Sequence, residues 1–466
     1  MKTAYSLLLC VATAIVSPAQ VFTTLVNFNG SNGNGPHGAV VQGRDGNLYG
    51  TTFGNFTSGT IYRMTHQGDL TTLYTFDLNA PYDGLVLGTD GDLYGTSESG
   101  GGQGAGTVFR ITEQGVLTTL YNFCPTGFCS DGRLPQGKLI QATDGNFYGS
   151  TYDGGNNQDC ADYDEYGCGT IFQVTPDGEL TNLHTFTNSD GAFPYDGLTE
   201  GINGELYGTA SQGGANGGGG VFEISPQGNF KLLYSFDACQ GLCLPNPNLI
   251  QTDDGRFFGS AASGGSQQGG GIFIMTPKGA VTTRYNFCNK PGCADGSEPT
   301  ALILGSDGNF YGMTAGFNFY VKCVAVGCTT LFRITPQGAL TVLHRFPPRI
   351  VINGRLLQAT DGKFYGTTTQ GGQSYRGTVF SLDVGLDPFV KPVNTAGQVG
   401  SVQGILGQGF TRTTSVTFSG TPANFTVDSD TYLEATVPAG ATTGYVEVTT
   451  PGGTLKSDRQ FRVLPQ

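Results

Sequence analysis

Two aspartates share one local sequence and are the foremost candidates for chemistry. Asp83 and Asp196 each stand in Pro-Tyr-Asp-Gly-Leu, and Lys138 and Arg355 fall one position later in related stretches. Glycoside hydrolases and lyases use paired carboxylates of this kind for general acid and base catalysis. However, an aspartate before glycine also caps a turn, and we favour that structural interpretation. We therefore treat the four residues as candidate binding groups and assign no catalytic residue.

A second group of acids flanks a cysteine. The group consists of Asp159, Asp162, Asp164 and Glu165. Carboxylate oxygens are the ligands that Ca²⁺ prefers, but this spacing matches no defined calcium loop. Calcium is therefore a candidate ligand of this loop, and the sequence predicts no other cofactor.

The four histidines do not form a nucleophilic site. His184 and His344 occupy the place of a repeated tyrosine, in LHTF and LHRF against LYNF. His37 precedes an expected strand and His66 lies in an expected turn, and neither belongs to a motif with a serine or cysteine nucleophile. The sequence therefore argues against a Ser/His/Asp hydrolase.

Ten of the eleven cysteines fall into close pairs. The pairs are Cys124/Cys129, Cys160/Cys168, Cys239/Cys243, Cys288/Cys293 and Cys323/Cys328. An even number of paired cysteines in an exported chain is typical of disulfides. Each pair offers two thiols, whereas a closed zinc site needs four ligands. We therefore predict five local disulfides.

A repeated unit must position all of these residues. Its clearest copy, residues 84–123, contains four short runs rich in Val, Ile, Thr, Tyr and Phe without a helical period. Asp90-Gly91 separates the first two runs and predicts a type I′ turn. Glu113-Gln114-Gly115, which becomes Pro-x-Gly in later copies, predicts a three-residue hairpin between the last two. The unit is therefore expected to be a four-stranded antiparallel meander.

The unit occurs seven times, with one strand displaced. A Tyr-Gly pair marks six copies and Phe258-Gly259 the seventh, at spacings of roughly 45 to 60 residues, which are typical of propeller blades. The last copy lacks its fourth strand, and residues 22–28 supply a matching strand at the start of the chain. We therefore predict a seven-bladed β-propeller, residues 20–384, closed by its N-terminal strand. An open β-solenoid and a β-sandwich array are the alternatives.

The cysteine pairs and the variable loops are expected on one face of this propeller. They lie between the fourth strand and the next first strand, or between the second and third strands, and these connections emerge on the same side. A rigid scaffold with variable loops on one side is how many binding surfaces are built. Stapling of long exposed loops for stability alone is an equally weighted alternative.

The N-terminal segment and the charge balance indicate export. Residues 1–19 combine Lys2, an apolar run and Ser17-Pro18-Ala19, which predicts a signal peptide cleaved near Ala19 and a secreted, cell-surface or periplasmic protein. No later stretch is apolar enough to span a membrane. A formal net charge of −13 argues against nucleic acid and anionic membranes as partners. We expect a monomer with an extracellular polysaccharide or protein partner.

A different pattern follows the repeats. Residues 385–388 are expected to form a linker, and residues 389–466 contain short alternating strands typical of a small β-sandwich.

Both regions resemble known families. The repeat, with ATDGNFYGSTYDGG and GTIFQVTPDGELTNLHTF, resembles the GloVer tandem repeat of secreted bacterial proteins over about residues 21–384. The C-terminal region, with Gly407-Gln408-Gly409-Phe410, resembles an IPT/TIG immunoglobulin-like domain. The first resemblance implies location and architecture but no activity, and the second implies a spacer or adhesive module.

Two functions therefore compete. The preferred hypothesis is a non-catalytic binding or adhesion protein that uses the disulfide-stapled face. The alternative is a secreted carbohydrate-active enzyme with carboxylates near the central opening. Paired acids about 5 to 10 Å apart would favour the enzyme, and a face rich in Tyr and Phe without such a pair would favour binding.

Overall fold

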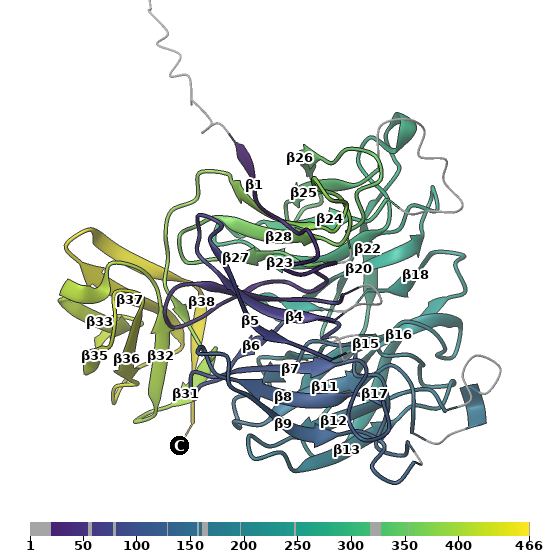
Figure 1. Ribbon diagram of the computed structural model, residues 1–466, viewed down its shortest axis with the longest axis horizontal. Helices are drawn as coiled ribbons and strands as arrows, with labels where there is room; N and C mark the ends of the chain where they lie inside the picture. The colour runs from purple at the N-terminus through teal and green to yellow at the C-terminus, as the bar shows by residue number, and fades with distance from the viewer. Residues whose placement is uncertain are drawn as a thin grey trace, which may run out of the picture.

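The chain folds almost entirely as β-strands joined by turns and loops (Figure 1). The computed structural model describes residues 20–54, 58–77, 81–127, 129–155, 158–160, 166–195, 197–246, 248–316, 328–352 and 354–465. Within these ranges the helical segments are three short 3₁₀ turns, namely η1 (Gln158–Cys160), η2 (Pro291–Cys293) and η3 (Phe410–Arg412).

Residues 21–383 of the described chain form seven sheets, here called the repeat sheets. Their first strands are β2 (Val41–Gln42), β6 (Val86–Leu87), β10 (Ile140–Gln141), β14 (Thr199–Glu200), β19 (Ile250–Gln251), β23 (Pro299–Leu304) and β27 (Leu357–Gln358). Their second strands are β3 (Leu48–Thr52), β7 (Leu93–Ser97), β11 (Phe147–Thr151), β15 (Leu206–Ala210), β20 (Phe257–Gly264), β24 (Phe310–Thr314) and β28 (Phe364–Thr368).

The outer half of each repeat sheet is equally regular. The third strands are β4 (Thr60–Met64), β8 (Thr107–Ile111), β12 (Thr170–Val174), β16 (Gly217–Ile224), β21 (Gly271–Met275), β25 (Thr330–Ile334) and β29 (Thr378–Asp383). The fourth strands are β5 (Leu70–Thr75), β9 (Leu117–Asn122), β13 (Leu180–Thr185), β17 (Phe230–Asp237), β22 (Val281–Asn286), β26 (Leu340–Arg345) and, in the seventh sheet, β1 (Val21–Asn27). The fifth sheet has an additional strand, β18 (Leu242–Pro245).

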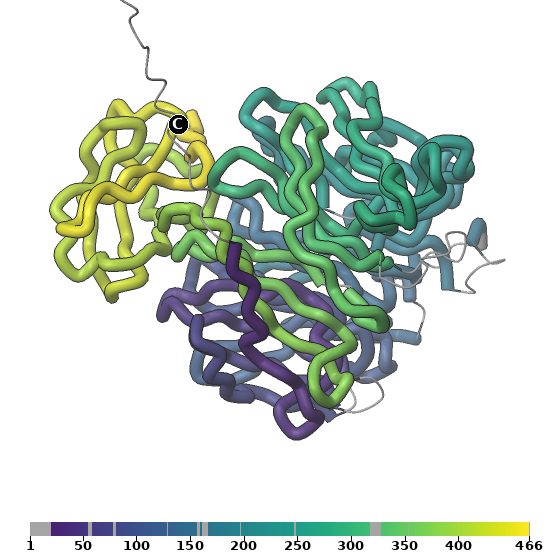
Figure 2. Tube along the Cα trace, turned by 90° about the horizontal axis from the view of Figure 1, so that it is seen from above, coloured from purple at the N-terminus to yellow at the C-terminus, as the bar shows by residue number. Residues whose placement is uncertain are grey.

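The displaced strand takes the predicted place. β1 pairs antiparallel with β29, from Val21 opposite Asp383 to Asn27 opposite Thr378. Figure 2 shows this first strand, in purple, running beside the green chain of the seventh sheet. The chain thus joins its N-terminal strand to a sheet made from residues more than 300 positions later.

The first sheet contacts the seventh in the same way that other neighbouring sheets contact each other. The Gln42 side chain bonds the Thr360 N–H through its carbonyl oxygen (3.0 Å), as Gln141 does for Thr89 (2.8 Å). Further contacts of this kind join the fourth sheet to the third, the fifth to the fourth and the seventh to the sixth. His66 of the first sheet adds a bond to Asp361 of the seventh (3.0 Å).

The repeated Tyr-Gly pair has a packing explanation. The glycine of each second strand lies directly over an aromatic ring of the third strand. A Cβ on Gly95 would stand 2.7 Å from the Phe109 ring, and one on Gly50 would stand 2.4 Å from the Tyr62 hydroxyl. Corresponding contacts link Gly149 to Phe172, Gly208 to Phe222, Gly259 to Phe273, Gly312 to Phe332 and Gly366 to Phe380. Glycine therefore makes room for an aromatic core side chain in each sheet.

The predicted type I′ turn is wrong. The Gly88 N–H donates to the Asp92 carbonyl (2.8 Å) and the Gly91 N–H to the Gly88 carbonyl (3.0 Å), so the loop has three residues. Only Gly91 takes a positive φ, of 95°. Asp90 accepts the Asp92 N–H (3.1 Å) and the hydroxyl of Tyr94 (2.6 Å). The aspartate is thus selected as a side-chain acceptor and not for a left-handed backbone.

The C-terminal region forms two further sheets. One contains β30 (Lys391–Pro392), β32 (Val402–Leu406), β35 (Phe425–Val427) and β36 (Tyr432–Thr436). The other contains β31 (Ala396–Gln398), β33 (Ser415–Phe418), β34 (Thr421–Pro422), β37 (Gly444–Thr450) and β38 (Gly453–Leu464). Buried side chains that include Ile405, Phe418 and Phe461 form the core of this region.

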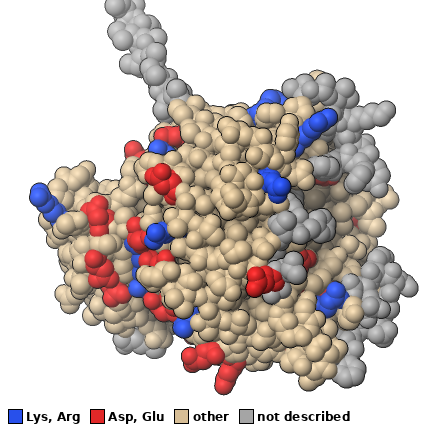
Figure 3. All heavy atoms as spheres, viewed as in Figure 1, with Lys and Arg blue, Asp and Glu red and all other residues tan. Residues whose placement is uncertain are grey.

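The C-terminal sheets are attached firmly to the repeat sheets. Leu406 and Tyr432 belong to the same apolar cluster as Tyr49, and Arg44 stacks over the Tyr432 ring at 4.5 Å. Within the expected linker, Leu386 packs on the seventh repeat sheet. Charged side chains gather over this junction, whereas the front of the repeat sheets shows few of them (Figure 3).

Candidate functional site

One cavity lies where the loops enter the first strands of the repeat sheets. It has a volume of about 230 Å³ and is here called the upper pocket. Six repeat sheets contribute a residue from the same position of the repeat, four residues before the first-strand residue that pairs with the Tyr or Phe of the second strand. These residues are His37, Tyr82, Gln136, Tyr195, Asn246 and Pro299, and Ile352 of the seventh sheet lies one position earlier in its repeat. The pocket is therefore built mainly from six equivalent positions that carry different side chains.

A proline precedes five of these six residues in the sequence. The pairs are Pro36-His37, Pro81-Tyr82, Pro135-Gln136, Pro194-Tyr195 and Pro245-Asn246, whereas in the sixth sheet the proline, Pro299, itself occupies the position. Sequence reasoning noticed this pattern only in the two Pro-Tyr-Asp-Gly segments and so missed the pocket as a set. The signal was the recurrence of Pro-x just before each first strand, with x free to vary.

The backbone before these prolines is held in an unusual conformation. Leu134, Phe193, Leu244 and Glu298 have positive φ values of 52° to 54°, and Gly35 has 65°. Hydrogen bonds fix this geometry on both sides: the Leu134 N–H donates to the Ala105 carbonyl (2.9 Å), and its carbonyl accepts from Tyr152 (3.0 Å). Left-handed non-glycine residues cost free energy and persist only where the surroundings enforce them. The pocket-lining side chains are therefore held on a rigid frame.

Aromatic rings form one side of the upper pocket. The hydroxyls of Tyr82 and Tyr195 lie 2.7 Å apart, and the His37 ring lies 4.5 Å from that of Tyr82. Burial, with Tyr195 adding to it, raises the pKa of Tyr82. Burial also lowers the pKa of His37 to about 4, although Asp83 opposes this shift. At neutral pH this side of the pocket is therefore uncharged.

An ion pair forms the inner end of the pocket. Arg355 Nη2 lies 3.2 Å from Asp83 Oδ2, and each side chain is 11% exposed. Asp83 also accepts the Gly84 N–H at 2.6 Å. The structure thus brings together two of the four sequence candidates, and Asp196 lies outside the described residues.

Lys138 lies on the other side of this ion pair. Burial, followed by the charge of Arg355, lowers the pKa of Lys138 to about 8. Lys138 and Arg355 line a second cavity, of about 380 Å³, here called the lower cavity. Its walls come from the first-strand segments of all seven repeat sheets and from the C-terminal sheets. Arg355 lines both cavities and therefore stands between them.

Disulfides support the loops around the upper pocket. Four bonds join Cys124 to Cys129, Cys160 to Cys168, Cys239 to Cys243 and Cys288 to Cys293, as predicted. Cys328 is also disulfide-bonded, and Cys323 lies outside the described residues.

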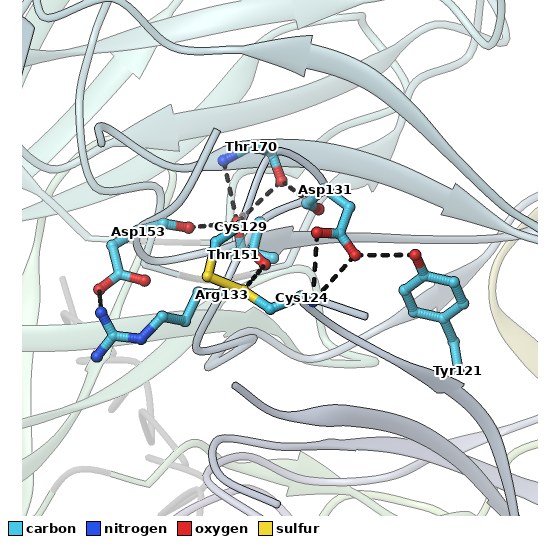
Figure 4. Close-up of a disulfide and its surroundings, with 9 residues drawn as sticks. Tyr121, Cys124, Cys129, Asp131, Arg133, Thr151, Asp153 and Thr170 are labelled. Carbon is cyan, nitrogen blue, oxygen red and sulfur yellow. Dashed lines mark hydrogen bonds and ion pairs between the residues drawn. A yellow bond between two sulfur atoms is a disulfide. The ribbon is translucent and has the colours of Figure 1, made fainter. Parts of the chain in front are cut away.

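The loop closed by Cys124 and Cys129 shows how this support works (Figure 4). Asp131 accepts the Tyr121 hydroxyl (2.8 Å) and the Cys124 N–H (3.1 Å). Asp153, whose side chain is fully buried, pairs with Arg133 at 3.0 Å. Gln136 of the upper pocket follows in the same loop and is therefore placed by these bonds.

The histidines of the fourth strands are structural, as expected. His184 pairs with Asp190 at 3.2 Å and stacks on Phe230, with ring centroids 3.8 Å apart. His344 stacks on Phe22 at the same distance. Asp190 is thus the carboxylate partner of His184, just as Asp131 is the carboxylate partner of Tyr121.

The expected calcium loop lies mostly outside the described residues. Those residues contain no group of three or more His, Cys, Asp or Glu side chains placed to hold a metal ion. Asp159 lies in η1, and the other three acids of the candidate group, Asp162, Asp164 and Glu165, lie outside the described residues.

Across the described part of the chain, no helix has the length and apolar character needed to cross a membrane.

Comparison with known proteins gives a family and a fold. A model of the Gloeobacter/Verrucomicrobia repeat matches residues 13–163 and 161–321, which together make up more than half of the chain. The structure is similar to the extracellular domain of a candidate hybrid two-component system from Bacteroides thetaiotaomicron, with 10% identity and a TM-score of 0.51 over 95% of this chain and 57% of that one. This likeness is one of fold alone, all-β and β-propeller-like.

Two other similar structures have lower TM-scores. An auxiliary nutrient binding protein from the same species has 11% identity and a TM-score of 0.43, over 78% of this chain and 76% of that one. A candidate 6-phosphogluconolactonase from Bacteroides uniformis has 14% identity and a TM-score of 0.43, over 70% and 91%. No curated protein matches the sequence.

Proposed function

The chain belongs to the Gloeobacter/Verrucomicrobia repeat family, and from this premise we propose that residues 20–384 form a closed seven-bladed β-propeller. The matching contacts between the first and seventh sheets support closure. Residues 389–466 are proposed to be an IPT/TIG immunoglobulin-like domain, joined through residues 385–388. The two antiparallel-dominated sheets around one apolar core support this assignment.

The protein is proposed to act outside the cytoplasm. Four complete disulfides support an oxidising compartment, because such bonds are rare where thiols are kept reduced. Residues 1–19, the expected signal peptide, lie outside the described residues.

Its proposed function is to bind a saccharide in the upper pocket without catalysis. The observation that carries this proposal is the set of six equivalent positions, in which the frame repeats and the side chain changes. Uniform residues would serve packing alone, whereas His37, Gln136 and Asn246 can each form different polar contacts. Sites that vary on a rigid frame are typical of recognition.

The chemistry of the lining favours a sugar over a charged or purely apolar ligand. Tyr82 and Tyr195 offer rings and hydroxyls, while Gln136 and Asn246 offer amides that donate and accept hydrogen bonds. The volume of about 230 Å³ lies below the roughly 300–1,000 Å³ of typical small-molecule pockets. The pocket therefore suits one sugar unit or a chain end.

Catalysis is the competing proposal. Asp83 and Glu298 both line the upper pocket and would be the acids of a glycosidase. However, the Asp83 carboxylate already pairs with Arg355 at 3.2 Å and accepts the Gly84 N–H at 2.6 Å. Recognition therefore explains the site with fewer requirements.

A glycan array with the protein from Gln20 onward tests the proposal. Retention and the release of reducing ends are measured on the same array. We expect retention without released product, and we expect Tyr195→Ala to reduce retention about tenfold, since an aromatic contact contributes about 0.5–1.5 kcal/mol beyond the apolar area that it buries.

Tyr375→Ala is the matched control, because Tyr375 is 71% exposed and does not line the pocket. It should retain glycans like the unchanged protein. Released reducing ends that disappear in Asp83→Asn or Glu298→Gln would establish the enzyme instead. An array with no retained glycan at all would reject the saccharide proposal.

A further inference from the structure

The lower cavity has a charge distribution unlike that of the rest of the protein. The chain has a formal net charge of −13. Among the described residues that line this cavity, one is acidic, Asp458, and four are basic: Lys138, Arg355, Lys391 and Arg459. In this acidic protein, cationic side chains from parts of the sequence more than 300 residues apart therefore line one internal cavity.

These cations raise the electrostatic free energy of one another. Burial and the charge of Arg355 lower the pKa of Lys138. Burial also lowers the pKa of Lys391, where Asp458 opposes the shift and Arg459 adds to it. Both directions indicate that the charged ammonium is disfavoured where it lies. A negative charge among these side chains would favour their charged forms.

Lys391 differs from the other buried cations in its ion pairing. Arg355 lies 3.2 Å from Asp83, and Arg462 lies 3.8 Å from Glu200. In the described part of the chain, no carboxylate comes within 4.0 Å of the Lys391 ammonium. Lys391 projects from the short strand β30 and lines the cavity. Its charge is therefore directed at the cavity and is not neutralised by a close partner.

We propose that the lower cavity is a binding site for a small oxyanion, held between the cations of the repeat sheets and those of the C-terminal sheets. Carboxylate, sulfate and phosphate share the chemistry that such a site recognises, which is two or more oxygens carrying delocalised charge. Because the overall negative charge of the protein repels anions at long range, binding has to be local to this cavity. The C-terminal sheets then complete a ligand site in addition to their role as an attached module.

Isothermal titration of the full mature chain with sodium sulfate, at ionic strength matched with sodium chloride, tests this proposal. We expect one saturable sulfate site per chain. Lys391→Met keeps a similar side-chain volume and should weaken sulfate binding at least about tenfold, because one close charge is lost. Lys278→Met, at an exposed turn of the fifth sheet, makes the same charge change and should leave binding unaltered.

Asp458→Asn provides a test of opposite sign. This change removes the carboxylate of the cavity, so sulfate binding should become tighter by several-fold. This result does not depend on the folding of Lys391→Met. Thermal unfolding of each variant tests whether that variant is folded. Binding that is absent in the unchanged protein, or unaffected by both Lys391→Met and Asp458→Asn, would overturn the proposal.

Titrations with inorganic phosphate and with acetate identify the preferred oxyanion. Tighter binding of phosphate or sulfate would favour a tetrahedral anion, and tighter binding of acetate would favour an organic acid. Either preference supports the proposed site. The glycan array is a separate measurement, so loss of saccharide retention in Tyr195→Ala with normal sulfate binding would show that the two sites are independent.

Discussion

The two cavities use neighbouring positions of one repeat for different chemistry. Gln136 lines the upper pocket, and Lys138, two residues later, lines the lower cavity. In the other repeats the same two positions carry pairs such as His37 and Ala39. The upper pocket is uncharged at its aromatic side, while the lower cavity is cationic. A single repeated frame can therefore present unrelated sites at its two ends when only a few positions vary.

A change at Arg355 should affect both cavities, because this residue lines both of them. Arg355→Met should lower the free energy of unfolding by about 3–5 kcal/mol, since it leaves Asp83 without its buried partner. Saccharide retention and sulfate binding should fall together. Chemical denaturation, the array and calorimetry measure the three effects.

The double variant Asp83→Asn/Arg355→Met is the control for this effect. Removing both charges avoids a buried unpaired carboxylate, so much of the lost stability should return. If the double variant is as unstable as Arg355→Met, the ion pair is not the reason for the loss.

Acidification should affect the upper pocket through His37. The unfolded chain binds a proton near pH 6.5, but the folded protein binds it only near pH 4, because burial lowers the pKa of His37. The unfolded state therefore holds more protons between these values, and the free energy of unfolding should fall by about 3 kcal/mol from pH 6.5 to pH 4. His37→Gln should remove this part of the pH dependence. An identical pH profile in the variant would contradict the assignment.

Loss of one disulfide should affect the upper pocket but not the lower cavity. Gln136 follows the Cys124–Cys129 loop in the same connection, so Cys124→Ser/Cys129→Ser should lower stability by about 2 kcal/mol and weaken saccharide retention. Sulfate binding should remain unchanged. A comparable loss of sulfate affinity would mean that the two cavities respond as one unit.

Alkaline pH should have the smallest effect, and at the lower cavity. The folded protein releases the Lys138 proton near pH 8, whereas the unfolded chain releases it near pH 10.5. The unfolded state holds more protons between these values, so the contribution of Lys138 to stability should rise by about 1–2 kcal/mol from pH 8 to pH 10.5, with allowance for screening in the cavity. Sulfate binding should weaken over the same range. Lys138→Met should be insensitive to pH by comparison.

Much of the architecture was predictable because it depends on local patterns. The strand order of the repeat, the pairing of β1 with β29 and the four described disulfides follow from repeated residues at fixed spacing. The turn type at Asp90-Gly91 was wrong because a side-chain acceptor and a left-handed residue give the same dipeptide signal. The number of residues in the loop, which decides between the two, depends on the register of the flanking strands.

The sites were less predictable than the fold. Asp83 and Arg355 were singled out separately, but their ion pair joins segments more than 270 residues apart. A variable residue follows most of the prolines that precede the first strands, and only the structure showed that these residues line one pocket. Lys391 and Arg459 carried none, because a lysine or arginine on a short β-strand is ordinarily solvated.

By itself the sequence determined the repeat, its strands, the places of its turns and the partners of its closest cysteines, because each of these is fixed by residues a few positions apart. Only the tertiary structure decided which side chains share a cavity. That outcome depends on how the repeat sheets meet one another and on where the C-terminal sheets attach, and both are set by packing between residues that are distant in the chain.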